Sequence, residues 1–227
     1  MSTDRIVDWH GCPPPSPVTL EGSYTRLEPL AAGHAAGLAA ATVGRPELYE
    51  YLHEEPPTDT AAVLAWIEAT TARTDLLMWA VVDRTTGVAG GRQALMRIDA
   101  GSGVVELGSI LWGPGIARTR IATQAFALHA QYVFDTLGYR RLEWKCNSAN
   151  VASRRAARRF GFTEEGTFAQ HQVVKGRNRD TTWFSLLDHQ WHDVHARLAA
   201  WLDPTNFDEH GRQILPLGGD PPGPVRG

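Results

Sequence analysis

The spacing of apolar residues divides the chain into short strands and amphipathic helices. Leu142, Trp144 and Cys146 alternate with charged residues, as in a strand with one buried face. From residue 121 onward, apolar residues recur at three- and four-residue spacing, which is typical of a helix packed on a core. The same pattern along the chain predicts strands at 25–30, 76–83, 88–97, 104–112, 141–146, 167–175 and 181–187, and helices at 30–41, 47–53, 61–72, 121–137, 150–160 and 189–201.

This order of elements predicts a mixed α/β fold with a mostly antiparallel central sheet and helices on both of its faces. Residues 1–17 end in a Pro-rich run and are expected to form an N-terminal extension. Residues 18–201 hold all the periodic segments and are expected to form one domain. Residues 202–227 are rich in Pro and Gly towards their end and are expected to form a C-terminal tail.

Composition and charge exclude several classes of function. The chain has 227 residues, a net charge of −3 and a pI near 6.3, which argues against nucleic acid as its partner. Its two cysteines, Cys12 and Cys146, stand in dissimilar contexts, so no disulfide framework is expected and the chain is predicted to be cytoplasmic. No signal peptide is visible and no apolar window is long enough to span a membrane, so no membrane partner is expected.

The richest chemical signal is a strand followed by a tight loop and a helix. The apolar run 104–112 leads into Gly113-Pro114-Gly115, and an amphipathic helix begins a few residues later. The first N–H groups of a helix have no intrahelical partner and carry partial positive charge, so they attract phosphate. Arg118 and Arg120 add full positive charge to this turn.

This segment, the downstream motif Asn150-x-x-Ser153 and the following Gly161-Phe162 together resemble the GCN5-related N-acetyltransferase (GNAT) superfamily. The Ala-Thr-Gln-Ala at 122–125 and the Asn-x-x-Ser motif resemble its RimJ/RimL-like branch, and the resemblance covers roughly residues 18–190. It implies a GNAT-like fold and an acyl-CoA-dependent N-acyltransferase that uses acetyl-CoA as cosubstrate and no metal. The implied acceptor is an amine of a small molecule or a protein N-terminus, which attacks directly without a covalent enzyme intermediate.

The resemblance also implies a donor site. The six positions of the diphosphate loop fall on Ala117, Arg118, Thr119, Arg120, Ile121 and Ala122. Ala122 fits the family pattern, whereas Ala117 replaces a Gln or Arg and Arg120 replaces a Gly. Further donor contacts are expected from the end of the preceding strand and from the next helix, at Ile110, Leu111, Trp112, Asn150, Ser153 and Arg155.

Three residues are candidates for catalysis. The resemblance implies that Ser153 protonates the leaving thiolate, a role that suits a hydroxyl because it can donate one proton while accepting a hydrogen bond from water. Glu106 and His171 are the two candidates for the base. Gln172 stands where the branch has a catalytic glutamate, and strand alternation would point the adjacent His171 to the other face unless a bulge intervenes.

Other residues have simpler interpretations. His129 and Cys146 lie in the apolar register of their elements and are predicted to be core residues. The basic loop 175–180 either recognises a carboxylate or phosphate on the acceptor or is merely solvated.

Two rival functions remain open at this point. The altered loop could accept another acyl-CoA, a carrier-protein arm or an aminoacyl-tRNA as donor. Alternatively, a catalytically degenerate protein of this fold could bind CoA or a partner protein without turnover. The acceptor, the base and the oligomeric state, including a homodimer, are left open.

Overall fold

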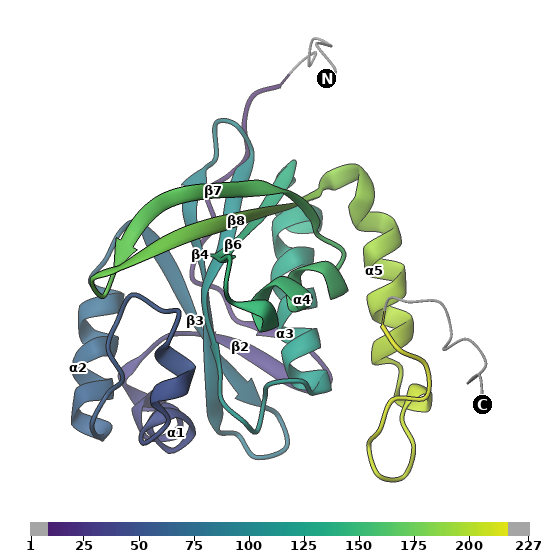
Figure 1. Cartoon of the computed structure of the whole chain (residues 1–227). Coiled ribbons are helices and arrows are strands. Elements are labelled where there is room, and N and C mark those ends of the chain that lie inside the picture. Colours follow the sequence, from purple (N-terminus) through teal and green to yellow (C-terminus); the bar gives the residue numbers. More distant parts are fainter. Residues whose placement is uncertain (1–8, 218–227) are drawn as a thin grey trace, which may run out of the picture.

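The computed structural model describes residues 9–217 and confirms the mixed α/β fold, with one eight-stranded sheet and helices on both faces (Figure 1). Its strands are β1 (Leu20–Glu21), β2 (Thr25–Pro29), β3 (Leu76–Asp83), β4 (Ala89–Asp99), β5 (Val104–Trp112), β6 (Arg141–Asn147), β7 (Thr163–Val174) and β8 (Arg177–Leu187). Its α-helices are α1 (Ala35–Thr42), α2 (Thr60–Thr71), α3 (Arg120–Gln131), α4 (Val151–Arg159) and α5 (Asp188–Leu202). Short 3-10 helices cover Ala32–His34, Pro46–Tyr49 and Pro204–Asn206, and a π-helical turn covers Tyr132–Thr136.

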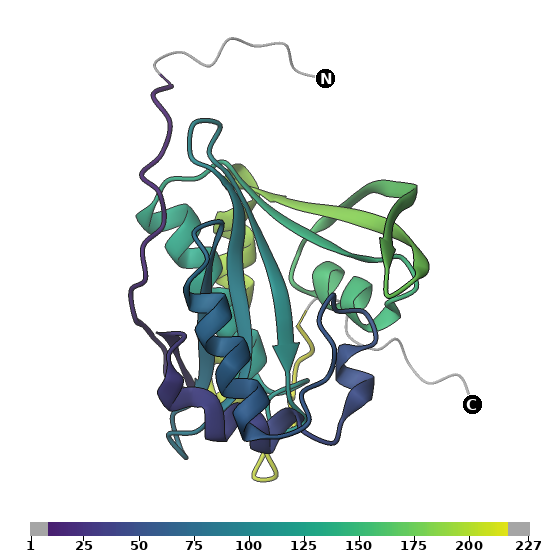
Figure 2. The ribbon, with the colours of Figure 1, turned by 90° about the vertical axis from the view of Figure 1, so that its left-hand side faces the viewer.

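The sheet has the order β1-β2-β3-β4-β5-β6-β8-β7 and is antiparallel except between β5 and β6. Those two strands run parallel and pair over only three positions, from Val104 with Arg141 to Glu106 with Glu143. Beyond Glu106 they diverge, so the half of the sheet that holds β6, β7 and β8 bends away from the half that holds β1 to β5 (Figure 2).

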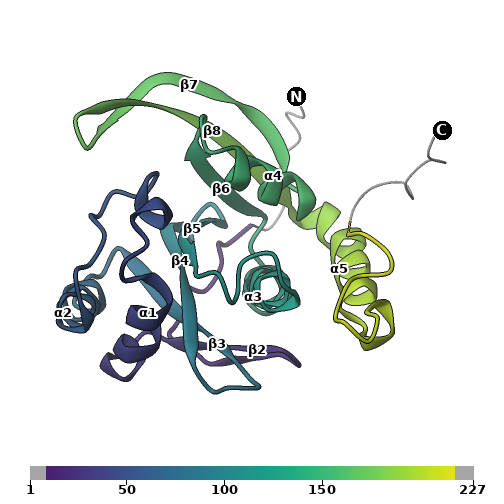
Figure 3. The ribbon, with the colours of Figure 1, turned by 60° about the horizontal axis from the view of Figure 1, so that its bottom comes forward.

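The helices form two layers around the sheet (Figure 3). On one face, α1 and α2 cover β3 and β4 and bury a small cluster that includes Leu38, Ile67 and Val82. On the other face, α3 packs against β1, β2 and β3, and its fully buried Phe126 stacks on Phe160 beside α4. Apolar residues therefore line both faces of the central strands, as the near-continuous apolar runs of β3 and β5 indicate.

Most predicted elements are confirmed within a few residues, and the exceptions have local causes. The predicted helix 30–41 begins only at Ala35, because the amide of Leu30 still bonds to Met78 on the neighbouring strand. The predicted helix 47–53 is a single 3-10 turn that begins at Pro46. The hairpin of β7 and β8 is longer than expected, and β8 starts at Arg177, inside the predicted loop 175–180.

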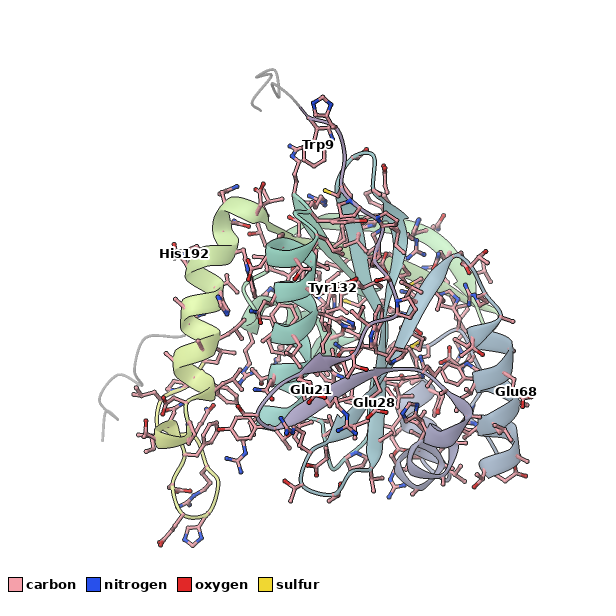
Figure 4. All side chains as sticks on the ribbon, turned by 180° about the vertical axis from the view of Figure 1, so that it is seen from behind. Trp9, Glu21, Glu28, Glu68, Tyr132 and His192 are labelled. Carbon is pink, nitrogen blue, oxygen red and sulfur yellow. The ribbon has the colours of Figure 1, made fainter. Side chains whose placement is uncertain are left out.

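Both ends of the described chain pack on the domain. Trp9 donates its indole N–H to Gly101 O at 2.7 Å, and the amide of Ser16 bonds to the hydroxyl of Tyr132 at 3.0 Å (Figure 4). After α5, Asn206 bonds to Trp201 and to Leu215, so residues 203–217 fold back as a strap along the helix. The rest of the predicted extension and tail, 1–8 and 218–227, lies outside the described residues. No helix within 9–217 has the length and apolar character needed to cross a bilayer.

Candidate active site

The divergence of β5 and β6 opens a cleft of about 830 Å³, which we call the β5–β6 cleft. Its lining includes Met96 and Arg97 of β4, Glu106–Ile110 of β5, Trp144–Asn147 of β6, Asn150 and Ser153 at the start of α4, His171, Gln172, Arg179, Thr181 and Trp183 of the β7–β8 hairpin, and Tyr51–Glu54.

A β-bulge on β5 shapes one wall of the cleft. Arg92 of β4 pairs with Leu111 but Ala94 pairs with Gly108, so Ser109 and Ile110 together oppose one residue of β4. Ser109 has a left-handed backbone, with φ of 50°, which turns this stretch of main chain toward the cleft.

A buried arginine holds the bulge from the far side of the sheet. The guanidinium of Arg92 donates to Ser109 O at 2.8 Å and to Ser109 Oγ at 2.7 Å, and it forms an ion pair with Glu54. It also lies 4.3 Å from the ring centre of Trp66. Burial lowers the pKa of Arg92 to about 10, so it stays protonated near neutral pH. The bulge is therefore fixed by a charged group rather than by strand pairing.

A second cavity, of about 250 Å³, lies beside the first on the α1 and α2 side of the sheet. Trp66, Tyr49 and Leu38 give it apolar walls, and Leu111 of β5 closes one side. Glu54 lines both cavities, so the segment 46–57 forms part of the boundary between them.

The loop 117–122 leaves several main-chain donors free. Thr119 caps α3 by accepting from the amide of Ile121 at 3.1 Å, as an N-cap residue does. Within residues 9–217, no hydrogen bond occupies the amides of Arg118, Arg120 and Ala122. The left-handed residue of this loop is Arg118, with φ of 64°, whereas Arg120 already begins the helix. The absence of a glycine at Arg120 therefore imposes no backbone strain.

The guanidinium of Arg120 does not lie where the sequence suggested. It packs over the ring of Tyr24 at 4.6 Å and faces Phe207 at 5.3 Å, so its charge is engaged by aromatic rings of the β1–β2 turn and the strap. Arg118 is exposed and has no ion pair among the described residues. It is the arginine of this loop that is free to meet a phosphate.

Of the three donor-binding residues expected at the end of β5, only one has its side chain in the cleft. Ile110 lines the β5–β6 cleft, but Leu111 is buried against the second cavity. Trp112 donates its indole N–H to Gln93 at 3.2 Å and contacts the ring of Phe160. The side chains of Leu111 and Trp112 therefore face away from the cleft, and only their main chain could contribute there.

The start of α4 brings Asn150 and Ser153 into the cleft. Asn150 caps the helix, because its Oδ1 accepts from the amide of Ser153 at 3.0 Å. The Oγ of Ser153 accepts from the indole N–H of Trp144 at 2.9 Å. On the solvent side of α4, Arg154 and Arg158 pair with Glu164, and the exposed Arg155 has no ion pair within the described chain.

Glu106 lies at the point where the strands part. Its side chain is only 5% exposed, and Oε2 contacts Arg97 at 2.6 Å and Lys145 at 3.0 Å. Lys145 also bonds to Glu143 at 2.8 Å and lies 3.6 Å from the ring centre of Trp183. The carboxylate is thus held by two cations in a small buried network.

A second bulge brings His171 into the cleft. The pairing of β7 with β8 shifts between Phe168 and Gln172, and Gln170 has a left-handed backbone with φ of 50°. Both His171 and Gln172 consequently line the cleft, whereas strand alternation alone would place them on opposite faces. The Nδ1 of His171 lies 3.0 Å from Thr181 Oγ1.

His129 and Cys146 are buried, as predicted. His129 is fully buried, and burial lowers its pKa to about 3. The thiol of Cys146 lines the cleft at 5% exposure, and burial raises its pKa above the ordinary value, which disfavours the nucleophilic thiolate. In the part of the chain that the structure describes, no three His, Cys, Asp or Glu side chains come together as metal ligands.

The contact between the β7–β8 hairpin and the segment 46–57, which covers the cleft, was not predicted from the sequence. The tip of the β7–β8 hairpin reaches the segment 46–57, where Lys175 donates to Tyr49 O at 3.0 Å (Figure 3). Arg179 donates to the Nε2 of His53 at 3.0 Å. Residues 51–57 carry no periodic pattern, and their Glu-Glu-Pro-Pro run indicates only a loop, so the sequence held no signal for this contact.

Comparison with known proteins gives a consistent result. A family model described as an acetyltransferase (GNAT) domain matches residues 25–163. A crystal structure of a GCN5-related N-acetyltransferase from Brucella melitensis is 49% identical, with a TM-score of 0.90 over 92% of this chain and 96% of that one. A GNAT-family structure from Chromobacterium violaceum is 37% identical, with a TM-score of 0.78 over 85% and 97%. An uncharacterized N-acetyltransferase, p20, from Bacillus licheniformis is 26% identical over 64% of this chain and 83% of its own length.

Proposed function

The chain belongs to the GNAT acetyltransferase family, and we propose on that basis that it transfers an acetyl group from acetyl-CoA to an amine. The observation that carries this proposal is the pairing of a cleft between diverging β5 and β6 with three amides at the start of α3 that no residue of 9–217 occupies. This arrangement suits a long, flexible thioester with a diphosphate at its far end.

The donor is proposed to lie along the opening between β5 and β6. Its diphosphate would be held by the amides of Arg118, Arg120 and Ala122, with the side chain of Arg118 adding charge. The pantetheine arm would pass Asn150, and the thioester would reach the bulge at Ser109 and Ile110. Arg155, exposed on α4, is proposed to meet the 3′-phosphate.

The reaction needs a neutral amine beside the thioester carbonyl, an acceptor for its proton and a donor for the departing thiolate. The amine nitrogen forms the new C–N bond, the C–S bond breaks, and CoA leaves as a thiol. Ser153 is proposed to donate the proton to sulfur. Its oxygen already accepts from Trp144, so its hydroxyl hydrogen points away from the indole.

His171 is the base that the geometry favours. Within the described residues its Nε2 has no partner, and a hydrogen bond from Nδ1–H to Thr181 would leave Nε2 as the acceptor. Glu106 is the alternative base. Its Oε2 already contacts both Arg97 and Lys145, so a structural role in the buried network competes with proton transfer.

The RimJ/RimL-like assignment, with an amine of a small molecule or a protein N-terminus as acceptor, is part of this proposal. It rests on the motif Asn150-x-x-Ser153, whose two side chains both reach the cleft. A different acyl donor would need the same loop and is distinguished by the titration that follows. CoA binding without turnover is distinguished by measuring release of the CoA thiol with amine acceptors.

The test is calorimetric titration of the purified full chain with acetyl-CoA. We expect micromolar binding, a loss of at least tenfold in Arg118→Glu, and a smaller loss in Arg120→Glu, whose native side chain is engaged with Tyr24. Arg84→Glu, in the exposed turn between β3 and β4, is the charge-matched control. If the wild type does not bind acetyl-CoA but binds a longer acyl-CoA, the donor is wrong; if it binds no CoA compound, the proposal fails.

A further inference from the structure

Arg179 is a buried cation without an anion. Its residue is 9% exposed, it lines the β5–β6 cleft, and none of the ion pairs among residues 9–217 includes it. Its Nε is buried and has no hydrogen-bond partner within the same residues. A desolvated guanidinium costs several kcal/mol unless an opposite charge compensates it.

The neighbours of Arg179 do not supply that charge. The Nε2 of His53 accepts from its guanidinium at 3.0 Å, and burial together with the nearby Arg179 and Arg97 lowers the pKa of His53. His53 is therefore a neutral acceptor that orients the guanidinium. The nearest acid of the cleft network, Glu106, is already shared between Arg97 and Lys145.

The other basic residues of the cleft are matched. Lys145 bonds to Glu106 and Glu143, Arg97 bonds to Glu106, and Arg73 pairs with Asp75. Glu47, on the outer part of the cleft, is exposed. The unmatched positive charge thus lies deep, at Arg179, rather than at the entrance.

The position of Arg179 places it near the proposed base. It precedes Thr181 by two residues on β8, which puts the two side chains on one face about 7 Å apart along the strand. Thr181 in turn contacts His171. An acceptor whose amine gives its proton to His171 could therefore bind Arg179 through an anionic group that lies only a few bonds from that amine.

Resting on the function proposed above, we propose that Arg179, oriented by His53, binds an anionic group of the acceptor, so that the acceptor is an amine that also bears a carboxylate or a phosphate. The donor diphosphate is assigned to a different segment, the start of α3, so CoA does not supply this anion. Within the basic β7–β8 hairpin, the buried Arg179 would recognise the anion of the acceptor, whereas Arg177 at the tip is exposed.

The experiment uses matched amine pairs with acetyl-CoA and measures release of the CoA thiol. Each pair holds an amine with and without its anion: free amino acids against their amides, ω-amino acids against the corresponding alkylamines, and aminoethyl phosphate against aminoethanol. The wild type is expected to prefer one class of anionic member at least tenfold in kcat/KM, and the preferred class shows whether the anion is a carboxylate or a phosphate.

Arg179→Met is expected to abolish that preference, measured as the ratio of kcat/KM between the two members of each pair, while the Kd of acetyl-CoA stays unchanged. Arg177→Met, on the same strand but exposed, is the matched control, and Arg179→Lys should retain part of the preference. Equal use of neutral and anionic amines by the wild type would overturn the proposal. So would an Arg179→Met variant that binds acetyl-CoA more weakly in the same proportion, because the anion would then belong to CoA.

A binding measurement covers the case in which no amine of the panel turns over. N-acetyl amino acids and O-phosphorylated N-acetylethanolamine, which mimic products, are titrated into the CoA-bound protein beside their neutral counterparts. Tighter binding of the anionic compounds to the wild type than to Arg179→Met supports the site, and equal binding rejects it. Failure of the proposed function itself would be seen separately, as absence of CoA binding.

Discussion

Trp144 donates its indole N–H to the Oγ of Ser153 at 2.9 Å, and Ser153 in turn gives its amide hydrogen to Asn150 at 3.0 Å. The strand β6 thus fixes the direction of a hydroxyl on the first turn of α4. Because one lone pair of Oγ is occupied, the hydroxyl hydrogen is directed away from the indole. A serine oriented in this manner is suited to donate to a leaving sulfur.

Ser153→Ala is therefore expected to lower kcat roughly 100-fold, the loss typical of removing a general acid. The Kd of acetyl-CoA should change by less than about threefold, since the cap at Asn150 uses the main chain of residue 153. Stopped-flow measurement of thiol release and calorimetry give the two quantities. Ser102→Ala, in the exposed turn after β4, is the control, and an undiminished kcat in Ser153→Ala would remove Ser153 from the mechanism.

Arg92→Met is expected to destabilise the fold by about 3 kcal/mol, because it breaks a buried ion pair and leaves Ser109 O without its donor. The bulge should loosen, so kcat should fall more than the affinity for acetyl-CoA. Urea unfolding and steady-state kinetics measure both effects. The double variant with Glu54→Gln should be less destabilised than the sum of its single variants; strict additivity would show that the pair does not act as a unit.

Stability should decline in weakly acidic solution because of His129. Its pKa falls from an ordinary 6.5 to about 3, so below pH 6.5 the unfolded chain binds a proton that the native chain does not. The contribution of neutral His129 to the free energy of unfolding is fully present above pH 6.5. As the pH falls from 6.5 toward 3, the free energy of unfolding decreases by about 1.4 kcal/mol per pH unit. Urea unfolding at pH 7.5, 6 and 5 gives the free energy of unfolding at each pH. This free energy should fall less steeply with decreasing pH in His129→Gln than in the wild type. The exposed His192→Gln should keep the wild-type slope, and identical slopes in all three proteins would refute the assignment.

His171→Ala is expected to reduce kcat/KM about 100-fold and to regain activity when imidazole is added, because the small base can enter the space left in the cleft. Glu106→Gln is expected to lower thermal stability, since Lys145 and Arg97 lose a shared carboxylate. Thiol-release assays with added imidazole distinguish the two residues. Glu106 would be the base if two results were found together. Added imidazole would fail to restore activity to His171→Ala, and Glu106→Gln would lose activity at an unchanged melting temperature.

The sequence predicted the sheet and its helices because the spacing of apolar residues within each segment reflects which of its faces is buried. The strand, the Gly-Pro-Gly breaker and the amphipathic pattern also predicted where α3 begins, whereas the cap at Thr119 was not predicted. Asn150 and Ser153 both line the cleft, because their motif lies at the end of a strand and the start of a helix, and their roles toward the donor stay a prediction.

Features that depend on register or on distant contacts were not predictable. The bulge in β7 sets residues 169–171 opposite the single residue Asp180, so His171 departs from simple alternation while Gln172 keeps the face of Phe168. Arg120 met Tyr24 and Phe207, which lie about 100 and 90 residues away along the chain. Arg179 lies in the predicted loop 175–180, and its burial depends on the contact with His53, which is 126 residues away along the chain.

Between the two halves of the sheet, the ladder of β5 and β6 has three residue pairs within the described chain, ending at Glu106 and Glu143. Every other neighbouring pair of strands from β2 onward is joined over five or more positions. The sheet is therefore continuous in its hydrogen bonding but is joined most weakly at Glu106–Glu143, where one buried core has to hold its two halves together. A ligand that bridges β5 and β6 would add a second connection across this junction, and we expect it to raise the melting temperature more than a ligand of similar affinity that contacts one half alone.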